Sequence, residues 1–197
     1  MGGSTIPDGE RVAMNRRQRL WIVAISSAFL SVSAAGKAAL SSPTNTHVVF
    51  RAAGPAGLTI EGTTPDLRAT EDAGNLVIVV PLANLTTGIS LRDQHMKEKY
   101  LEVARYPDTT LTVARSALRL PAGGERVEAD APGTLSLHGQ TRPVLVHYQA
   151  TRDGDAFAAT GRFRVTMTEY GVSVPSYLGV TVKPDVDVSA SFRIAGN

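Results

Sequence analysis

Arg92, Asp93 and His95 are the residues of this chain best placed to do chemistry, because all three fall within one predicted helix over residues 90–101. A guanidinium such as that of Arg92 pairs with phosphate or carboxylate oxygens through two parallel hydrogen bonds. A neutral histidine both donates and accepts hydrogen bonds. We therefore take Arg92 and His95 as candidates for binding a polar head group. The alternative is structural: Asp93 caps the helix, Arg92 ties a loop and His95 satisfies a backbone carbonyl.

The chain has four histidines whose spacing is not that of a metal site: His47, His95, His138 and His147. It lacks HxH and HExxH motifs, and it has no cysteine to supply a thiolate. His138 and His147 fall on neighbouring strands of one predicted hairpin, where they approach each other only if the turn is a long one. Ser90, Asp93 and His95 are close in sequence, but residues 88–92 do not form the nucleophile elbow of hydrolases. We therefore predict no metal, no cofactor and no enzymatic activity.

The predicted helix over residues 90–101 is amphipathic. Ser90 can cap it, and Asp93 completes a Ser-x-x-Asp capping pattern at its positive end. An apolar stripe recurs at spacings of four and three residues, formed by Met96, Tyr100 and Val103. Because strands dominate the rest of the chain, we expect this helix to cover the mouth of a barrel or the edge of a sheet.

Beyond residue 40 the chain alternates apolar and polar residues with a period of two, which predicts about eight or nine strands. This pattern favours an all-β antiparallel sheet that closes into a barrel and so removes its edges. Residues 76–82 are apolar throughout and are expected to be buried on both faces. The predicted inward faces carry Leu135, Leu137, Val144, Val146, Tyr148, Phe163, Val165, Met167, Val188, Ala190 and Phe192. These side chains could line a hollow tunnel or fill a closed core, and alternation alone does not distinguish the two.

The N-terminal region differs in composition from the rest. Three arginines between residues 16 and 19 precede an apolar run that ends in small residues. This predicts a cleaved signal peptide over residues 14–38, with an uncleaved membrane anchor as the alternative. Residues 1–13 are expected to be disordered and residues 41–197 to form one β domain. The chain beyond residue 38 holds 15 basic and 16 acidic residues, so we expect no nucleic-acid partner.

Two phrases of the sequence carry a resemblance to a known family. Residues 91–96 read Leu-Arg-Asp-Gln-His-Met and are followed by Tyr106-Pro107. Residues 133–144 read Gly-Thr-Leu-Ser-Leu-His-Gly-Gln-Thr-Arg-Pro-Val. In this order, behind a signal peptide, the two phrases resemble the YceI-like family of bacterial periplasmic proteins.

The resemblance implies an eight-stranded lipocalin-like barrel with a tunnel that holds a polyisoprenoid or a similar amphiphilic lipid. The tunnel residues would be Leu135, Leu137, Val146, Tyr148, Phe163, Val165, Met167, Val188 and Phe192, with Arg92 and His95 at the polar end of the lipid. The implied protein is periplasmic and lipid-binding, has no stable membrane anchor after cleavage, and leaves a homodimer open. The alternative is a stress-response or interaction module, not an enzyme, with a filled barrel core.

Overall fold

The computed structural model describes residues 42–177 and 180–195. Nine strands form one antiparallel sheet in the order β2-β1-β11-β8-β7-β6-β5-β4-β3, and β9 pairs with β10 separately. The main sheet consists of β1 (Thr44–Ala53), β2 (Thr59–Thr64), β3 (Arg68–Asp72), β4 (Asn75–Pro81), β5 (Asp108–Ala114), β6 (Arg126–Leu137), β7 (Gln140–Asp153), β8 (Ala156–Thr166) and β11 (Asp185–Ala195). The small pair is β9 (Ser176–Tyr177) and β10 (Val180–Thr181).

The predicted all-β antiparallel class is confirmed, but the main sheet has nine strands, one more than the eight that the family resemblance implies. The chain between residues 59 and 72 forms two of these strands, β2 and β3. Pro65 lies between them and has no amide hydrogen to give to a ladder. The Thr64 hydroxyl accepts a hydrogen bond of 3.1 Å from the Asp66 amide, which turns the chain at this point.

The main sheet is curled, and its two edge strands, β2 and β3, directly follow each other in the chain. Among the strands described, no ladder joins these two edges, so the prediction of a fully closed barrel is wrong in this respect. The edge of β2 is bonded instead to the segment after β4. There the backbones of Thr63 and Thr86 exchange two hydrogen bonds of 2.8 and 2.9 Å. This bridge gives part of the open edge a partner.

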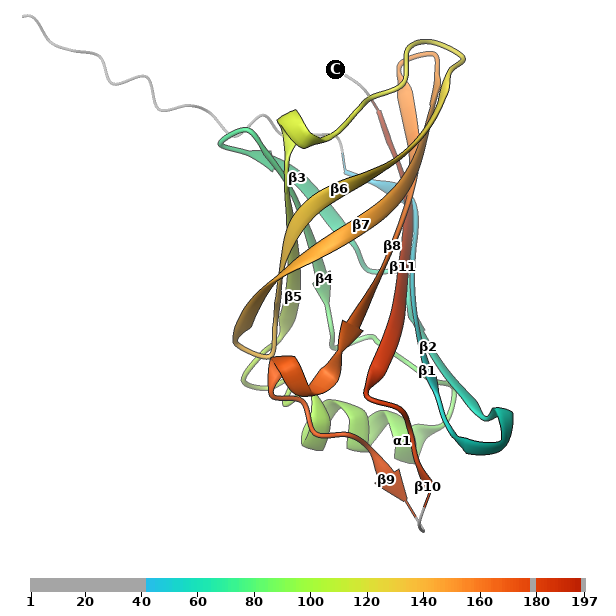
Figure 1. Cartoon of the computed structure of the whole chain (residues 1–197), viewed down its shortest axis with the longest axis vertical. Coiled ribbons are helices and arrows are strands. Elements are labelled where there is room, and N and C mark those ends of the chain that lie inside the picture. Colours follow the sequence, from blue (N-terminus) through green and yellow to red (C-terminus); the bar gives the residue numbers. More distant parts are fainter. Residues whose placement is uncertain (1–41, 178–179, 196–197) are drawn as a thin grey trace, which may run out of the picture. The chain divides into compact units, whose positions relative to one another are not determined.

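The curled sheet has two different ends (Figure 1). The helix α1 (Ser90–His95) lies at one end with the β1–β2 hairpin, the β6–β7 hairpin and the β9–β10 pair; we call this the helix end. The β3–β4, β5–β6 and β7–β8 connections lie at the opposite end, which we call the far end. The β6–β7 hairpin turns through His138 and Gly139, whose φ angles of 51° and 73° suit a two-residue turn.

The predicted helix forms, but its start differs from the prediction. It is α-helical over Ser90–His95 and continues as a π-helical turn, η2, over Met96–Tyr100. Ile89, not Ser90, is the N-cap residue, and no side chain caps the first turn. The carboxylate of Asp93 accepts hydrogen bonds from Thr86 and Thr87 ahead of the helix. The prediction that Ser90 caps the helix is therefore wrong, and Asp93 fixes the approach of the chain instead.

The predicted disordered extension at residues 1–13 and the predicted signal peptide at residues 14–38 lie outside the described residues. Within the part of the chain that is described, no helix has both the length and the apolar composition needed to cross a membrane. The described elements all fall within the predicted β domain at residues 41–197, whose boundaries stay a prediction.

Candidate functional site

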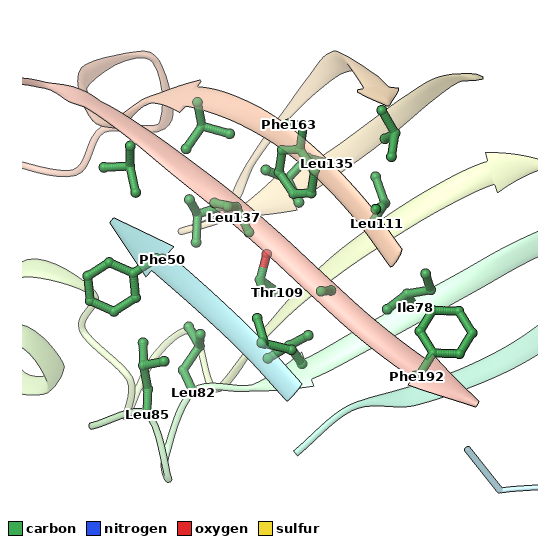
Figure 2. A pocket seen from close by; sticks show the side chains of 18 of the residues that line it. Phe50, Ile78, Leu82, Leu85, Thr109, Leu111, Leu135, Leu137, Phe163 and Phe192 are labelled. Carbon is green, nitrogen blue, oxygen red and sulfur yellow. The ribbon is translucent and has the colours of Figure 1, made fainter. Parts of the chain in front are cut away.

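The curled sheet encloses a cavity of about 1390 Å³ whose lining residues extend from the helix end to the far end. Alternate residues of each strand form its wall; on β4 these are Leu76, Ile78 and Val80. Figure 2 shows labelled side chains from β1, β4, β5, β6, β8 and β11 directed into one shared space. Since a water molecule takes up ~30 Å³ of liquid, the cavity has room for about 46 waters. It is therefore far larger than a packing defect.

All the tunnel and head-group residues predicted from sequence line this one cavity. The tunnel candidates in its wall are Leu135, Leu137, Val146, Tyr148, Phe163, Val165, Met167, Val188 and Phe192. The head-group candidates Arg92 and His95 line it at the helix end, together with Met96 and Tyr100 of the predicted apolar stripe. Val103, the third residue of that stripe, lies beyond the helix. That these residues contact a ligand stays a prediction.

The interior is hollow rather than filled. Phe50, Phe163 and Phe192 come from three different strands and face the cavity, yet each is only partly buried. In a filled core, inward-facing aromatic side chains would be enclosed by neighbours at close to crystalline packing density. Leu135 and Val146 also line the cavity and are buried against neighbouring side chains of the wall. The cavity thus decides between the two interiors that alternation left open.

Sequence reasoning missed the part of the wall that the first half of the chain supplies. The missed residues include Phe50, Ile60, Leu76, Ile78, Val80, Leu82, Leu85, Leu111 and Val113. On β4 the alternation was hidden in a continuous apolar run: Val77 and Val79 do not line the cavity and are partly exposed. The prediction that this strand is buried on both faces is therefore wrong. An apolar outer face on a strand leaves no polar residue to mark the inward positions.

Arg92 is held in place at the helix end by the loop that precedes it. Its Nε donates to the Thr87 hydroxyl at 2.7 Å and its Nη2 donates to the Thr87 carbonyl oxygen at 2.8 Å. Nη1 makes no hydrogen bond within the described residues and is available to an anionic ligand group. His95 and Lys99 also line the cavity at this end. The structural alternative for Arg92, a tie to a loop, is therefore correct, and it positions the guanidinium at the cavity.

Asp93 is committed to the same loop and does not take part in a catalytic arrangement with Ser90 and His95. Partial burial raises the pKa of Asp93, but the hydrogen bonds from Thr86 and Thr87 lower it more, so its pKa lies below the ordinary value. The carboxylate stays charged at neutral pH and neutralises part of the positive charge nearby. Asp93 itself does not line the cavity; the wall residues with basic side chains at this end are Arg92, His95 and Lys99.

The far end of the cavity is held by Tyr148. Its hydroxyl accepts a hydrogen bond of 2.7 Å from the Arg119 amide and donates one of 3.0 Å to the Arg119 carbonyl oxygen. These bonds fix the connection between β5 and β6, whose Leu118 and Leu120 line the cavity. The charged wall residues here are Glu71, Arg115 and Arg152. Glu71 is thus the acidic member of the wall, and it lies at the end opposite Arg92.

The Tyr-Pro and His-Gly motifs meet outside the cavity, in a contact that we call the clasp (Tyr106, His138, Gly139 and Tyr170). The rings of Tyr106 and His138 lie 4.5 Å apart, and His138 Nδ1 lies 3.2 Å from the Tyr170 carbonyl oxygen. A Cβ on Gly139 would lie 2.8 Å from the Tyr106 ring, so the close approach requires glycine. The clasp holds the loop after the helix against the β6–β7 hairpin.

His147 lies on the outer surface of β7, away from His138. Its Nδ1 lies 2.8 Å from Asp130 and its Nε2 lies 2.9 Å from Glu128. The hydrogen bond to Asp130, followed by that to Glu128, raises the pKa of His147 above its ordinary value. The two-residue turn keeps His138 and His147 apart. Among residues 42–177 and 180–195, no cluster of histidine, aspartate and glutamate could hold a metal ion.

A curled antiparallel sheet around an apolar cavity, with one helix at its end, is lipocalin-like in architecture. The particular family follows from comparison with known sequences. The chain belongs to the YceI-like domain family, whose model matches residues 40–194.

Sequence relatives include UPF0312 proteins from pseudomonads. That of Pseudomonas savastanoi pv. phaseolicola is 28% identical over 130 residues, which covers 61% of this chain and 63% of the relative. That of Pseudomonas fluorescens is 28% identical with the same coverage. The chain thus spans less than two thirds of the length of the curated relatives it matches.

Two solved structures share the fold. A polyisoprenoid binding domain from Saccharophagus degradans superimposes with a TM-score of 0.66 at 19% identity, covering 80% of this chain and 97% of that one. BcnA of Burkholderia cenocepacia gives a TM-score of 0.60 at 15% identity, covering 75% and 95%. At these identities the likeness concerns the fold.

Proposed function

We propose that this protein binds a long apolar chain, a polyisoprenoid or a similar amphiphilic lipid, inside the curled sheet. The observation that carries the proposal is the cavity of about 1390 Å³ lined by apolar side chains from both halves of the chain. Water in such a cavity would face apolar surface on most sides, and a lipid that replaces it gains ~25 cal/mol for each Å² of apolar surface buried. Ligand sites for small molecules typically measure only ~300–1,000 Å³, which favours a ligand longer than an ordinary metabolite.

The charges of the wall suggest how the lipid lies in the cavity. Arg92, His95 and Lys99 line the helix end, whereas the acidic Glu71 lies at the far end. A phosphate or carboxylate head group would therefore be bound at the helix end, where Arg92 Nη1 is available. The apolar chain would then extend past Phe163 and Phe192 toward the far end. The solved domain from Saccharophagus degradans, which shares this fold, is a polyisoprenoid binding domain.

The role we infer is to sequester or carry the lipid, without chemical conversion. The carboxylate at the helix end that could act as a base, that of Asp93, is committed to structural hydrogen bonds with Thr86 and Thr87. We further propose that the protein acts in the periplasm. The charged, then apolar, then small-residue pattern of residues 14–38 supports this location.

Two measurements test the proposal. Protein purified from its native host is extracted and analysed by mass spectrometry, and retinol, a fluorescent isoprenoid alcohol, is titrated into delipidated protein. We expect a co-purifying lipid and saturable retinol binding. Retinoic acid should bind more tightly than retinol to the wild type, and the R92Q variant should lose this preference because the guanidinium is gone. Repeated absence of bound lipid together with absence of saturable retinol binding would refute the proposal.

A further inference from the structure

The mouth of the cavity at the helix end is surrounded by exposed apolar side chains. Within the described residues, the large apolar side chains that are exposed to solvent are Leu58, Ile89, Leu91, Leu120 and Leu145. Leu58, Ile89 and Leu91 line the cavity at the helix end; their exposed fractions are 44%, 53% and 55%. We call these three residues the apolar rim. Exposed apolar groups gathered at the opening of a site, rather than scattered, indicate a surface that contacts something apolar.

The three residues of the apolar rim lie in two stretches of chain that have no charged residue. The β1–β2 hairpin is uncharged from residue 52 to residue 60, and the chain is uncharged from residue 73 to residue 91, where α1 begins. Pro55 and Ala56 at the hairpin tip are exposed as well. The far end differs, because its connections carry Glu71, Asp72, Arg115, Arg119, Glu125, Arg152, Asp153 and Asp155. The uncharged stretches 52–60 and 73–91 could thus enter an apolar medium without burying a charge, a cost that the charged connections of the far end would incur.

Basic residues are in excess next to the apolar rim. Arg92, His95 and Lys99 line the mouth beside Ile89 and Leu91. On the helix, the acidic Asp93 and Glu98 are outnumbered by Arg92, Lys97 and Lys99, so residues 90–100 carry one net positive charge with His95 neutral. Apolar side chains bordered by basic ones are the combination that binds to bilayers with anionic head groups, where apolar groups enter the interface and cations meet phosphates.

We propose that the apolar rim docks on the surface of a lipid bilayer that contains anionic phospholipids, so that the cavity opens directly onto the membrane. This inference rests on the proposed function, since a protein that loads a lipid needs a route from the bilayer to its cavity. Docking places the mouth within the head-group layer, and the apolar chain enters the cavity without crossing water. The far end, with its charged connections, faces away from the membrane.

The test is vesicle co-sedimentation of the exported protein, with its N-terminus determined by mass spectrometry. The vesicles are either phosphatidylcholine alone or equal parts of phosphatidylcholine and phosphatidylglycerol. We expect binding to the mixed vesicles, and we expect I89D/L91D to weaken it at least tenfold. The matched control is L145D, because Leu145 is 63% exposed on β7 and does not line the cavity. L145D should bind as the wild type does, and L120D tests the far end in the same way.

Several outcomes would overturn the inference. One is equal loss of binding in I89D/L91D and L145D, and another is loss in L120D alone. Wild-type protein that ignores mixed vesicles yet binds retinol without vesicles would refute docking while leaving lipid binding intact. If retinol does not bind and no lipid co-purifies, the proposed function itself fails. Urea unfolding of each variant, including the uncharged I89N/L91N, shows whether a loss of binding comes from misfolding. K99E changes the charge beside the rim without changing the rim itself, so it should weaken binding to the mixed vesicles only.

Discussion

Replacing Phe192 by tryptophan tests whether the cavity is hollow in solution. Phe192 lies on β11, faces the cavity and is only partly buried, so a larger ring has space to enter (Figure 2). We expect F192W to change the free energy of unfolding by less than about 0.5 kcal/mol, as at unpacked positions. A filled core would lose about 1–3 kcal/mol through overpacking. The two interiors therefore predict different stabilities for the same variant.

Urea unfolding, monitored by circular dichroism, measures this difference in the free energy of unfolding. With an m value of ~2 kcal/mol per molar urea, a hollow interior moves the midpoint by less than about 0.25 M and a filled one by about 0.5–1.5 M. Retinol should bind F192W at least tenfold more weakly, because the indole takes up ligand space; this corresponds to about 1.4 kcal/mol.

Tyr148→Phe is the positive control for the stability assay. It removes the two hydrogen bonds to Arg119 and should cost about 1–3 kcal/mol in total. For the same reason Tyr148→Trp would be a poor test of the cavity. A destabilised F192W that still binds retinol with wild-type affinity would refute the reasoning.

Three further predictions concern the frame around the cavity. Asp93→Asn should lower the free energy of unfolding by about 1–2 kcal/mol at neutral pH; because the pKa of Asp93 is lowered, the difference should vanish as the pH falls below 3.8 in urea titrations. Gly62→Ala should cost about 1–3 kcal/mol, since its Cβ would lie 2.1 Å from the Phe50 ring, whereas Gly123→Ala meets no atom and should be neutral. His147→Gln should lower Tm at pH values below 6.5, with a gap that closes as the pH rises through the raised pKa of the folded protein; a gap independent of pH would contradict the ion pairs with Asp130 and Glu128.

The sequence was most informative where one face of a strand is apolar and the other polar. Leu135 and Leu137 alternate with polar residues and face the cavity, as predicted. Across β4 the same inference failed, because Val77 and Val79 are apolar although they do not face the cavity. Periodicity reports only a contrast between two faces, so a strand that is apolar on both gives no direction.

Contacts between different segments of the chain could not be predicted, even where the segments are close in sequence. Ser90 has the residue type of a helix cap, but Ile89 is the N-cap residue. Asp93 accepts hydrogen bonds from Thr86 and Thr87 in the loop before the helix. Whether β2 and β3 come close enough to pair likewise depends on the combined curl of the seven strands between them in the sheet. No local pattern of residues determines that curl. The volume of the cavity follows from the same curl, so it could not be predicted from the sequence either.

The clasp belongs to the family signature but not to the cavity wall. Tyr106, His138 and Gly139 belong to the motifs by which the family resemblance was found, yet none of them lines the cavity. These residues hold the loop after the helix against the β6–β7 hairpin, whichever ligand the cavity binds. Replacing Phe163 or Val188, which line the cavity, would change which molecule fits into it and would leave the clasp intact. Other residues of the same motifs, such as Arg92, Leu135 and Leu137, do line the cavity, so only the clasp part of the signature is independent of what the cavity holds.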